Sequence, residues 1–320
     1  MERMLQRVSH LAEAARSRTR AAARTIAVRY GGLPHSVGTV DSPPPPVAHD
    51  VTQLWLRNLT SRDPITDSTS DETVTMTTHG QRIRDVWLAI ESIGRGDRLP
   101  SRIILWLDEG TKVPWRLRRL RSRGLEIQQV ARGWGVHTKY WPYVSRVDPV
   151  GPLVTADDDI LYPPNWLQDL HTLHERYPDD VIAFRAHSMV MVDHDNFAPY
   201  SSWPTCTSTE PSYAHFATSV SGQLLPTGLQ NALREEGPGF IEICPTADDV
   251  WIHRCAVAHG FRTRQVEERS LHWWFIPGSQ TSGLNAVNVV GGANDAQLRA
   301  THTELTRGRI WASAGRPQRT

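Results

Sequence analysis

The sequence predicts an α/β protein in which a mostly parallel sheet is covered by helices, and three observations support this class. Short segments typical of strands alternate with segments typical of helices along residues 72–185. The run Ile103–Leu107 is continuously apolar and ends at a polar Asp-Glu-Gly, as expected of a parallel strand buried on both faces. Gly and Pro residues separate these segments. In such sheets, ligands bind beyond the carboxyl ends of the strands.

The individual elements follow from local patterns. Alternation predicts strands at the first and third positions, and Pro114 and Gly124 are typical of a helix start and a helix end. The expected order is a strand at 74–78, a helix at 82–93, a strand at 102–107, a helix at 114–123, a strand at 125–130, a strand at 153–155, a helix at 166–177 and a strand at 181–185.

Composition excludes several classes of protein. The 320 residues carry a net charge of +1, so no overall field favours nucleic acid, and no nucleic-acid partner is expected. The longest apolar runs are far shorter than the ~20 residues that cross a bilayer. Three cysteines at unrelated spacings indicate a reduced, cytoplasmic setting. Twelve tryptophans favour a carbohydrate ligand, because sugar rings stack on indole faces.

The chain divides into four expected parts. Residues 1–30 are rich in Arg and have apolar residues at helical spacing, which predicts a basic helix on the inner face of a membrane; the alternative is a solvated extension. Residues 31–71 are expected to be a Pro/Ser/Thr-rich linker. A compact α/β domain is expected over 72–300, and residues 301–320 are expected to be a C-terminal tail.

Three consecutive aspartates carry the strongest functional signal. Asp157, Asp158 and Asp159 follow a short apolar strand, and adjacent carboxylates repel each other unless water or a cation offsets the repulsion. Oxygen ligands suit a hard divalent cation. Because side chains alternate along extended backbone, Asp157 and Asp159 are expected to face the ligand and Asp158 to point elsewhere. The alternative is an Asp-rich turn into Pro163 and Pro164.

These residues resemble those of a known family. Segments 139–143 (Lys-Tyr-Trp-Pro-Tyr), 155–164 (with the aspartates) and 245–251 (Pro-Thr-Ala-Asp-Asp-Val-Trp) together resemble the GT-A glycosyltransferases, and within them the exostosin-like and bacterial capsule-type transferases. The resemblance covers roughly residues 73–300. It implies a Rossmann-like sheet for the nucleotide and a smaller mixed sheet on the acceptor side.

The resemblance also implies a reaction. A hexosyl or N-acetylhexosaminyl group would pass from a nucleoside-diphosphate sugar, expected to be a UDP-sugar, to a glycan or a lipid-linked acceptor. Mn²⁺ or Mg²⁺ would neutralise the charge that grows on the departing diphosphate. Asp159 would bind the metal, with Asp157 contacting the ribose or a metal-bound water.

Further residues receive roles from the same resemblance. Thr77, Thr78 and Arg82 would meet the nucleotide with Asp157 and Asp158, although Arg82 also fits a solvated helix position. Either Asp249 or Asp248 would be the base or charge stabiliser, the alternative being an N-cap. His272 would be a further metal ligand, the alternative being a structural histidine.

Two other functional classes also fit these residues. A glycoside hydrolase needs two carboxyl groups ~5–9 Å apart across the sugar, and Asp157 with Asp249 is the candidate pair. A non-catalytic sugar-binding module that holds Ca²⁺ with the acidic loop would be mostly β. Nucleotide binding distinguishes a transferase from both.

Overall fold

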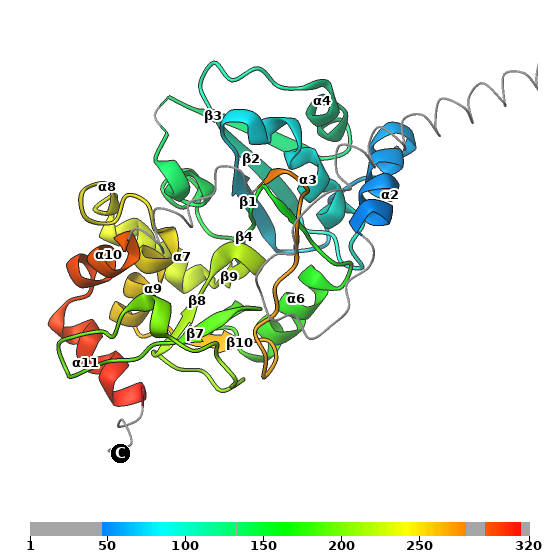
Figure 1. Ribbon diagram of the computed structural model, residues 1–320. Coiled ribbons are helices and arrows are strands. Elements are labelled where there is room, and N and C mark those ends of the chain that lie inside the picture. The colour runs from blue at the N-terminus through cyan, green and yellow to red at the C-terminus, as the bar shows by residue number, and fades with distance from the viewer. Residues whose placement is uncertain (1–46, 132, 280–291, 315–320) are drawn as a thin grey trace, which may run out of the picture.

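A computed structural model of the chain describes residues 47–131, 133–279 and 292–314. Its centre is one seven-stranded sheet with the strand order β10-β6-β9-β4-β1-β2-β3 (Figure 1). All neighbouring strands are parallel except β9, which is antiparallel to β4 and β6. The strands are β1 Thr73–Thr77, β2 Arg102–Asp108, β3 Leu125–Val130, β4 Leu153–Thr155, β6 Val181–Ala183, β9 Gln223–Leu225 and β10 Thr263–Gln265.

Two small sheets accompany the central one. Both are two-stranded and antiparallel, whereas the sequence suggested one smaller mixed sheet. They pair β5 (Ile160–Leu161) with β11 (Trp274–Phe275), and β7 (Ala186–Ser188) with β8 (His215–Ala217). The first pair matters for the site, because β5 follows the aspartates directly.

Helices cover both faces of the central sheet. The α-helices are α2 Val47–Thr60, α3 Val86–Gly94, α4 Trp115–Arg121, α5 Trp141–Val144, α6 Trp166–Arg176, α7 Thr227–Glu236, α8 Phe240–Ile243, α9 Asp248–Ala258, α10 Ala293–Thr301 and α11 Glu304–Ser313. The 3₁₀ helices are η1 Gly80–Arg84, η2 Gly135–Lys139, η3 Tyr200–Ser202 and η4 Ser219–Ser221.

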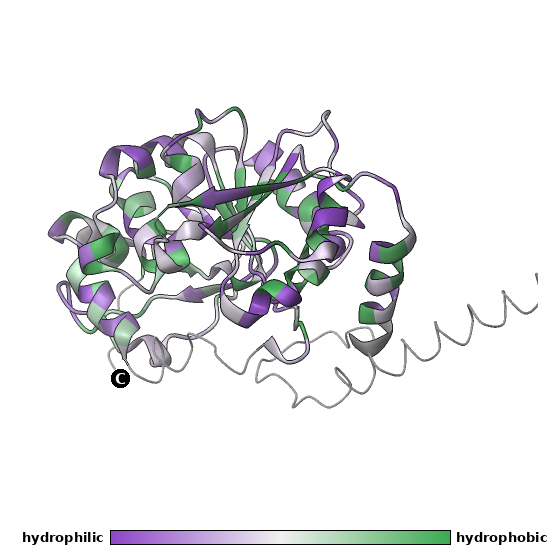
Figure 2. Cartoon of the chain, turned by 90° about the horizontal axis from the view of Figure 1, so that it is seen from above, coloured by the Kyte–Doolittle hydropathy of each residue, from purple (hydrophilic) through white to green (hydrophobic). Residues whose placement is uncertain are grey.

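The structure has two apolar clusters, and the alternating side chains of β2 contribute to both. Ile103 and Leu105 pack into one apolar cluster, with α2, α3 and α6, whereas Ile104 and Trp106 pack into another, with α5, α7 and α9. Successive side chains of a strand point to opposite faces, so a continuous apolar run serves both clusters. Figure 2 shows green and purple segments alternating along the helices, as expected of helices with one apolar and one polar face. The predicted α/β class with a mostly parallel sheet is confirmed.

Two expected boundaries are wrong. The stretch 31–71 is not a linker throughout, because α2 packs on α3 with Val51 and Leu54 buried. The stretch 301–320 is not simply a tail, because α11 packs on α9 and buries Ile310. In both cases buried apolar residues, rather than local composition, decide that the segment is folded.

The basic extension predicted over residues 1–30 lies outside the described residues. None of the helices in the described ranges combines the length and the apolar character needed to cross a membrane.

Candidate active site

The carboxyl ends of β1 and β4 bring two predicted segments together. The strands are parallel neighbours, with Thr75 opposite Thr155, so the residues that follow each strand emerge at the same edge of the sheet. Thr78 and Arg82 follow β1, and the three aspartates follow β4.

Arg82 joins the second and third aspartates. Its Nη1 lies 2.9 Å from Asp158 Oδ1 and 3.0 Å from Asp159 Oδ2. Thr78 Oγ1 donates to the other oxygen of Asp158 at 2.5 Å. Burial raises the pKa of Asp158 against the opposing effect of Arg82. Arg82 is therefore a site residue and not a solvated helix residue.

Asp157 points to a different partner. Its Oδ1 lies 2.5 Å from Lys139 Nζ, and its backbone N–H donates to the Tyr162 hydroxyl at 2.7 Å. The expectation that Asp157 and Asp159 share one direction is wrong, because the chain turns at Asp158 and Asp159 instead of continuing extended. Asp157 is the most open of the three side chains, with 22% exposure against 6% for Asp158 and 7% for Asp159.

Lys139 links the triplet to the second acidic pair. Its Nζ lies 3.0 Å from Asp248 Oδ2 and donates to Ser219 Oγ at 2.9 Å, in addition to its contact with Asp157. These three partners use the three donors of an ammonium group. Burial alone would lower the pKa of Lys139, but Asp157, Asp248 and Asp249 together hold it well above its usual value. The lysine therefore stays charged between two acidic clusters.

Asp249 occupies the first turn of α9 beside Asp248. Its Oδ1 accepts a hydrogen bond from the backbone N–H of Ser219 at 3.0 Å. Burial and the neighbouring Asp248 raise the pKa of Asp249 to about 7. The N-cap position of α9 is Ala247, so neither aspartate caps the helix. Both carboxylates face the site instead.

The pairing of β5 with β11 carries His272 toward the aspartates. The backbone N–H of Ile276 donates to the Asp159 carbonyl at 2.6 Å, which ties β11 to the triplet. Burial and the positive charge of Arg185 lower the pKa of His272 to about 4, while Asp157 opposes that shift. His272 is thus a neutral imidazole close to Asp157. A neutral imidazole is the form that binds metals.

The predicted residues differ in how directly they join this group. Asp157, Asp158, Asp159, Thr78, Arg82, Asp248 and Asp249 form one connected set with Lys139 and Ser219. Thr77 does not join it through its side chain, because its Oγ1 donates to the Trp106 carbonyl at 3.1 Å.

The side chains of this set include suitable ligands for a hard cation. Within the described residues, however, their ligand atoms do not all lie within 4.8 Å of one another. Carboxylate oxygens of Asp157 and Asp159 match the oxygen ligands that Mn²⁺ and Mg²⁺ prefer, and the neutral imidazole of His272 is in the form that binds a metal. Within the described residues, only Asp71, Glu72 and His171 bring three such ligand atoms within 4.8 Å. Arg98 already pairs with that group, at 3.0 Å from Glu72 and 3.3 Å from Asp71, so it is an ion-pair network.

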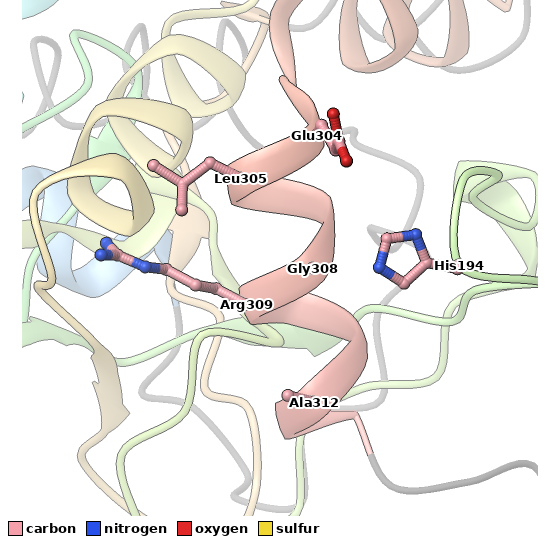
Figure 3. A pocket seen from close by; sticks show the side chains of 6 residues that line it. All are labelled: His194, Glu304, Leu305, Gly308, Arg309 and Ala312. Atoms are coloured by element: carbon pink, nitrogen blue, oxygen red, sulfur yellow. The ribbon is translucent and has the colours of Figure 1, made fainter.

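A surface hollow of about 540 Å³ lies elsewhere, along α11 (Figure 3). His194 faces this helix from the other side, and Glu304, Leu305 and Arg309 complete the lining with Gly308 and Ala312. None of the aspartates lines it. We assign it no part in the chemistry of the sheet edge.

Sequence reasoning missed the functional weight of three residues. Lys139 stood in the segment that carried the resemblance, but a single lysine in a loop has no spacing that reveals its partners. Ser219 lies between the acidic clusters, and Arg185 follows β6 beside His272. Their roles depend on contacts between segments that lie from 18 to more than 100 residues apart in the sequence.

Comparisons with known proteins give distant similarities. No protein-family model and no curated protein matches the sequence. Among solved structures, the mannosyltransferase PcManGT of Pyrobaculum calidifontis in complex with GDP-Man and Mn²⁺ matches at TM-score 0.42 and 14% identity, over 68% of this chain and 61% of that chain. TarS of S. aureus in complex with UDP matches at TM-score 0.45 and 13% identity, over 76% and 70%.

A third match is a different kind of enzyme. The inositol-1-phosphate CTP transferase of T. maritima matches at TM-score 0.40 and 11% identity, over 71% of this chain and 97% of that chain. For the mannosyltransferase, the match spans about three fifths of the length of that protein.

Proposed function

We propose that the chain is a metal-dependent glycosyltransferase of GT-A type that uses a nucleoside-diphosphate sugar. The observation that carries this proposal is the pair of acidic clusters at the carboxyl edge of the central sheet. Asp157, Asp158 and Asp159 form one cluster and Asp248 with Asp249 the other, and Lys139 lies between them. One cluster suits the donor and the other suits the acceptor.

The donor side rests on the aspartates that follow β4. Asp159 and Asp157 would hold Mn²⁺ or Mg²⁺, with His272 as a further ligand. The metal would stabilise the negative charge of the departing diphosphate as a Lewis acid. Arg82 and Thr78 fix Asp158, which gives the turn one shape and orients the carboxylates on either side.

The acceptor side rests on Asp249. A general base is most effective when its pKa is near the working pH, and the pKa of Asp249 is about 7. Its carboxylate would take the proton of the acceptor hydroxyl while that oxygen bonds to the anomeric carbon and the nucleoside diphosphate leaves. Asp248 is in contact with Lys139 and would stabilise charge rather than move a proton.

The finer assignments extend the same proposal. We expect a UDP-sugar that carries a hexosyl or N-acetylhexosaminyl group, and a glycan or lipid-linked acceptor.

We also expect peripheral contact with the inner face of a membrane through residues 1–30. Deletion of residues 1–45 should abolish binding to anionic liposomes, and unchanged binding would remove the membrane assignment.

The test is a screen of UDP- and GDP-sugars for donor hydrolysis with and without Mn²⁺. Hydrolysis of at least one donor should require the metal and should fall by a factor of 100 or more in Asp159→Asn, on the order of the loss expected for removing a key electrostatic group. Metal-independent cleavage of a glycoside without nucleotide would favour the hydrolase instead. The all-β module disagrees with the observed α/β architecture.

A further inference from the structure

Arg185 lies half-buried at the edge of the site. No carboxylate pairs with its guanidinium among the described residues. Its Nη1 donates to Thr218 Oγ1 at 3.2 Å, and no Asp or Glu pairs with it in ranges 47–131, 133–279 and 292–314. Residues 280–291, outside those ranges, contain neither Asp nor Glu. A partly desolvated guanidinium without a counter-charge is unfavourable and marks a place for an anion.

Three other arginines on or beside the sheet differ in this respect. Arg82 holds two carboxylates, and the buried Arg264 on β10 holds Asp180 at 2.7 Å. Arg102 on β2 makes a two-pronged pair with Glu126 at 2.7 Å. In these three cases the guanidinium has a carboxylate partner. Arg185 keeps most of its five donors for another partner.

The position of Arg185 is on the acceptor side. It follows β6, which β9 separates from β4, so two strand spacings of about 4.8 Å each lie between it and the strand of the aspartate triplet. Its partner Thr218 precedes Ser219, whose backbone N–H binds Asp249. The charges of Asp249 and Arg185 both act on the Tyr200 hydroxyl, so the two groups lie near one ring.

We propose that Arg185 binds an anionic group of the acceptor, a sugar carboxylate or a phosphate, beside the base Asp249. This inference rests on the proposed function, and it narrows the acceptor to an acidic glycan or a phosphorylated one. The planar guanidinium forms two parallel hydrogen bonds with either oxyanion, which a lysine cannot reproduce.

The experiment compares binding of acidic and neutral probes to the full chain. The probes are a disaccharide that contains glucuronic acid, its methyl ester and inorganic phosphate, each followed by calorimetry or ligand-observed NMR. The variants are Arg185→Met and Arg185→Lys. Arg118→Met is the matched control, because Arg118 is exposed on α4. UDP with Mn²⁺ is titrated in parallel, by thermal midpoint, as the donor probe.

The expected result is that the wild-type chain binds the acidic disaccharide or phosphate and prefers the acid to its ester. Arg185→Met should weaken that binding by roughly tenfold or more, since it removes charge-assisted hydrogen bonds. Arg185→Lys should recover it only in part, and the control should leave it unchanged. The disaccharide and phosphate arms distinguish a uronic acid from a phosphorylated acceptor.

Three outcomes overturn the inference. The wild-type chain could bind neither acidic probe, the ester could bind as well as the acid, or Arg185→Met could weaken UDP with Mn²⁺ as strongly as the acidic probe. The last would assign Arg185 to the donor diphosphate. Failure of the proposed function is a separate result, seen as no response of the wild-type chain to any nucleotide.

Discussion

Replacement of Asp249 with Asn should stabilise the fold at alkaline pH while it removes transfer. The carboxyl group lies half-buried beside Asp248, and its pKa in the folded chain is about 7 rather than 3.8. Asn keeps the oxygen that accepts from Ser219 and cannot ionise. The variant therefore removes a charge that the folded state disfavours without removing the hydrogen bond.

The magnitude follows from the shift in pKa. Each pKa unit corresponds to about 1.36 kcal/mol, so a shift of about three units corresponds to ~4 kcal/mol in full. Because water reaches part of this side chain, we expect about half of that, ~2 kcal/mol. A single substitution that stabilises by this amount is unusual and easy to measure.

The sign depends on pH. Between pH 4 and 7 the unfolded chain has released the Asp249 proton and the folded chain retains it, so stability falls as the pH rises through this window. Above pH 7 both states are ionised and the penalty is complete. At pH 4 and below, Asp249→Asn should therefore match the wild type, and at pH 8 it should be more stable.

Urea unfolding at pH 4, 6 and 8 measures the effect. The control is Asp179→Asn, an exposed aspartate outside the site, which should change the free energy of unfolding by less than about 0.5 kcal/mol at each pH. If Asp249→Asn is less stable than the wild type at pH 8, or follows the wild-type pH dependence, the assignment of a raised pKa to Asp249 is wrong.

Two further predictions concern the charge of Lys139 and the packing at Gly222. Lys139→Met leaves two carboxylates without their shared ammonium and should destabilise by about 3–5 kcal/mol in urea unfolding, whereas Lys112→Met on the surface should have little effect. Gly222→Ala should also destabilise, by more than about 2 kcal/mol, because φ is +95° and the new Cβ would lie 2.5 Å from Trp166 Nε1. Gly237→Ala, at φ +71° with open space around it, bears backbone strain alone and should cost about 1–3 kcal/mol, less than Gly222→Ala, and equal losses at the two glycines would contradict the predicted clash.

The sequence was enough to predict the parallel half of the fold. Strands such as β2 and helices such as α3 depend on local patterns, namely a continuous apolar run and a helical repeat ended by Gly94. By contrast, β9 is three residues long and enters the middle of the sheet antiparallel to its neighbours. Its pairing depends on distant partners, so no local pattern could reveal it.

The sequence predicted the acidic residues of the site but not the contacts that join them. An Asp triplet at a strand end has a recognisable pattern, and so does the later acidic pair at the start of α9. The turn that directs Asp158 and Asp159 to Arg82 is a property of the folded backbone. The contacts of Lys139 cross 18 residues to Asp157 and more than 100 to Asp248, a distance at which spacing gives no information.

The most direct test of the proposed function is whether metal and nucleotide bind together through Asp159. The thermal midpoint of the wild-type chain should rise with UDP or GDP plus Mn²⁺ by more than with either component alone, since ligands that bind the folded state stabilise it by mass action. Asp159→Asn should lose this joint stabilisation and keep its own midpoint close to that of the wild type. A wild-type chain that responds to no nucleotide, or an Asp159→Asn variant that keeps the full joint response, would contradict the assignment of the aspartate triplet to a metal-dependent donor site.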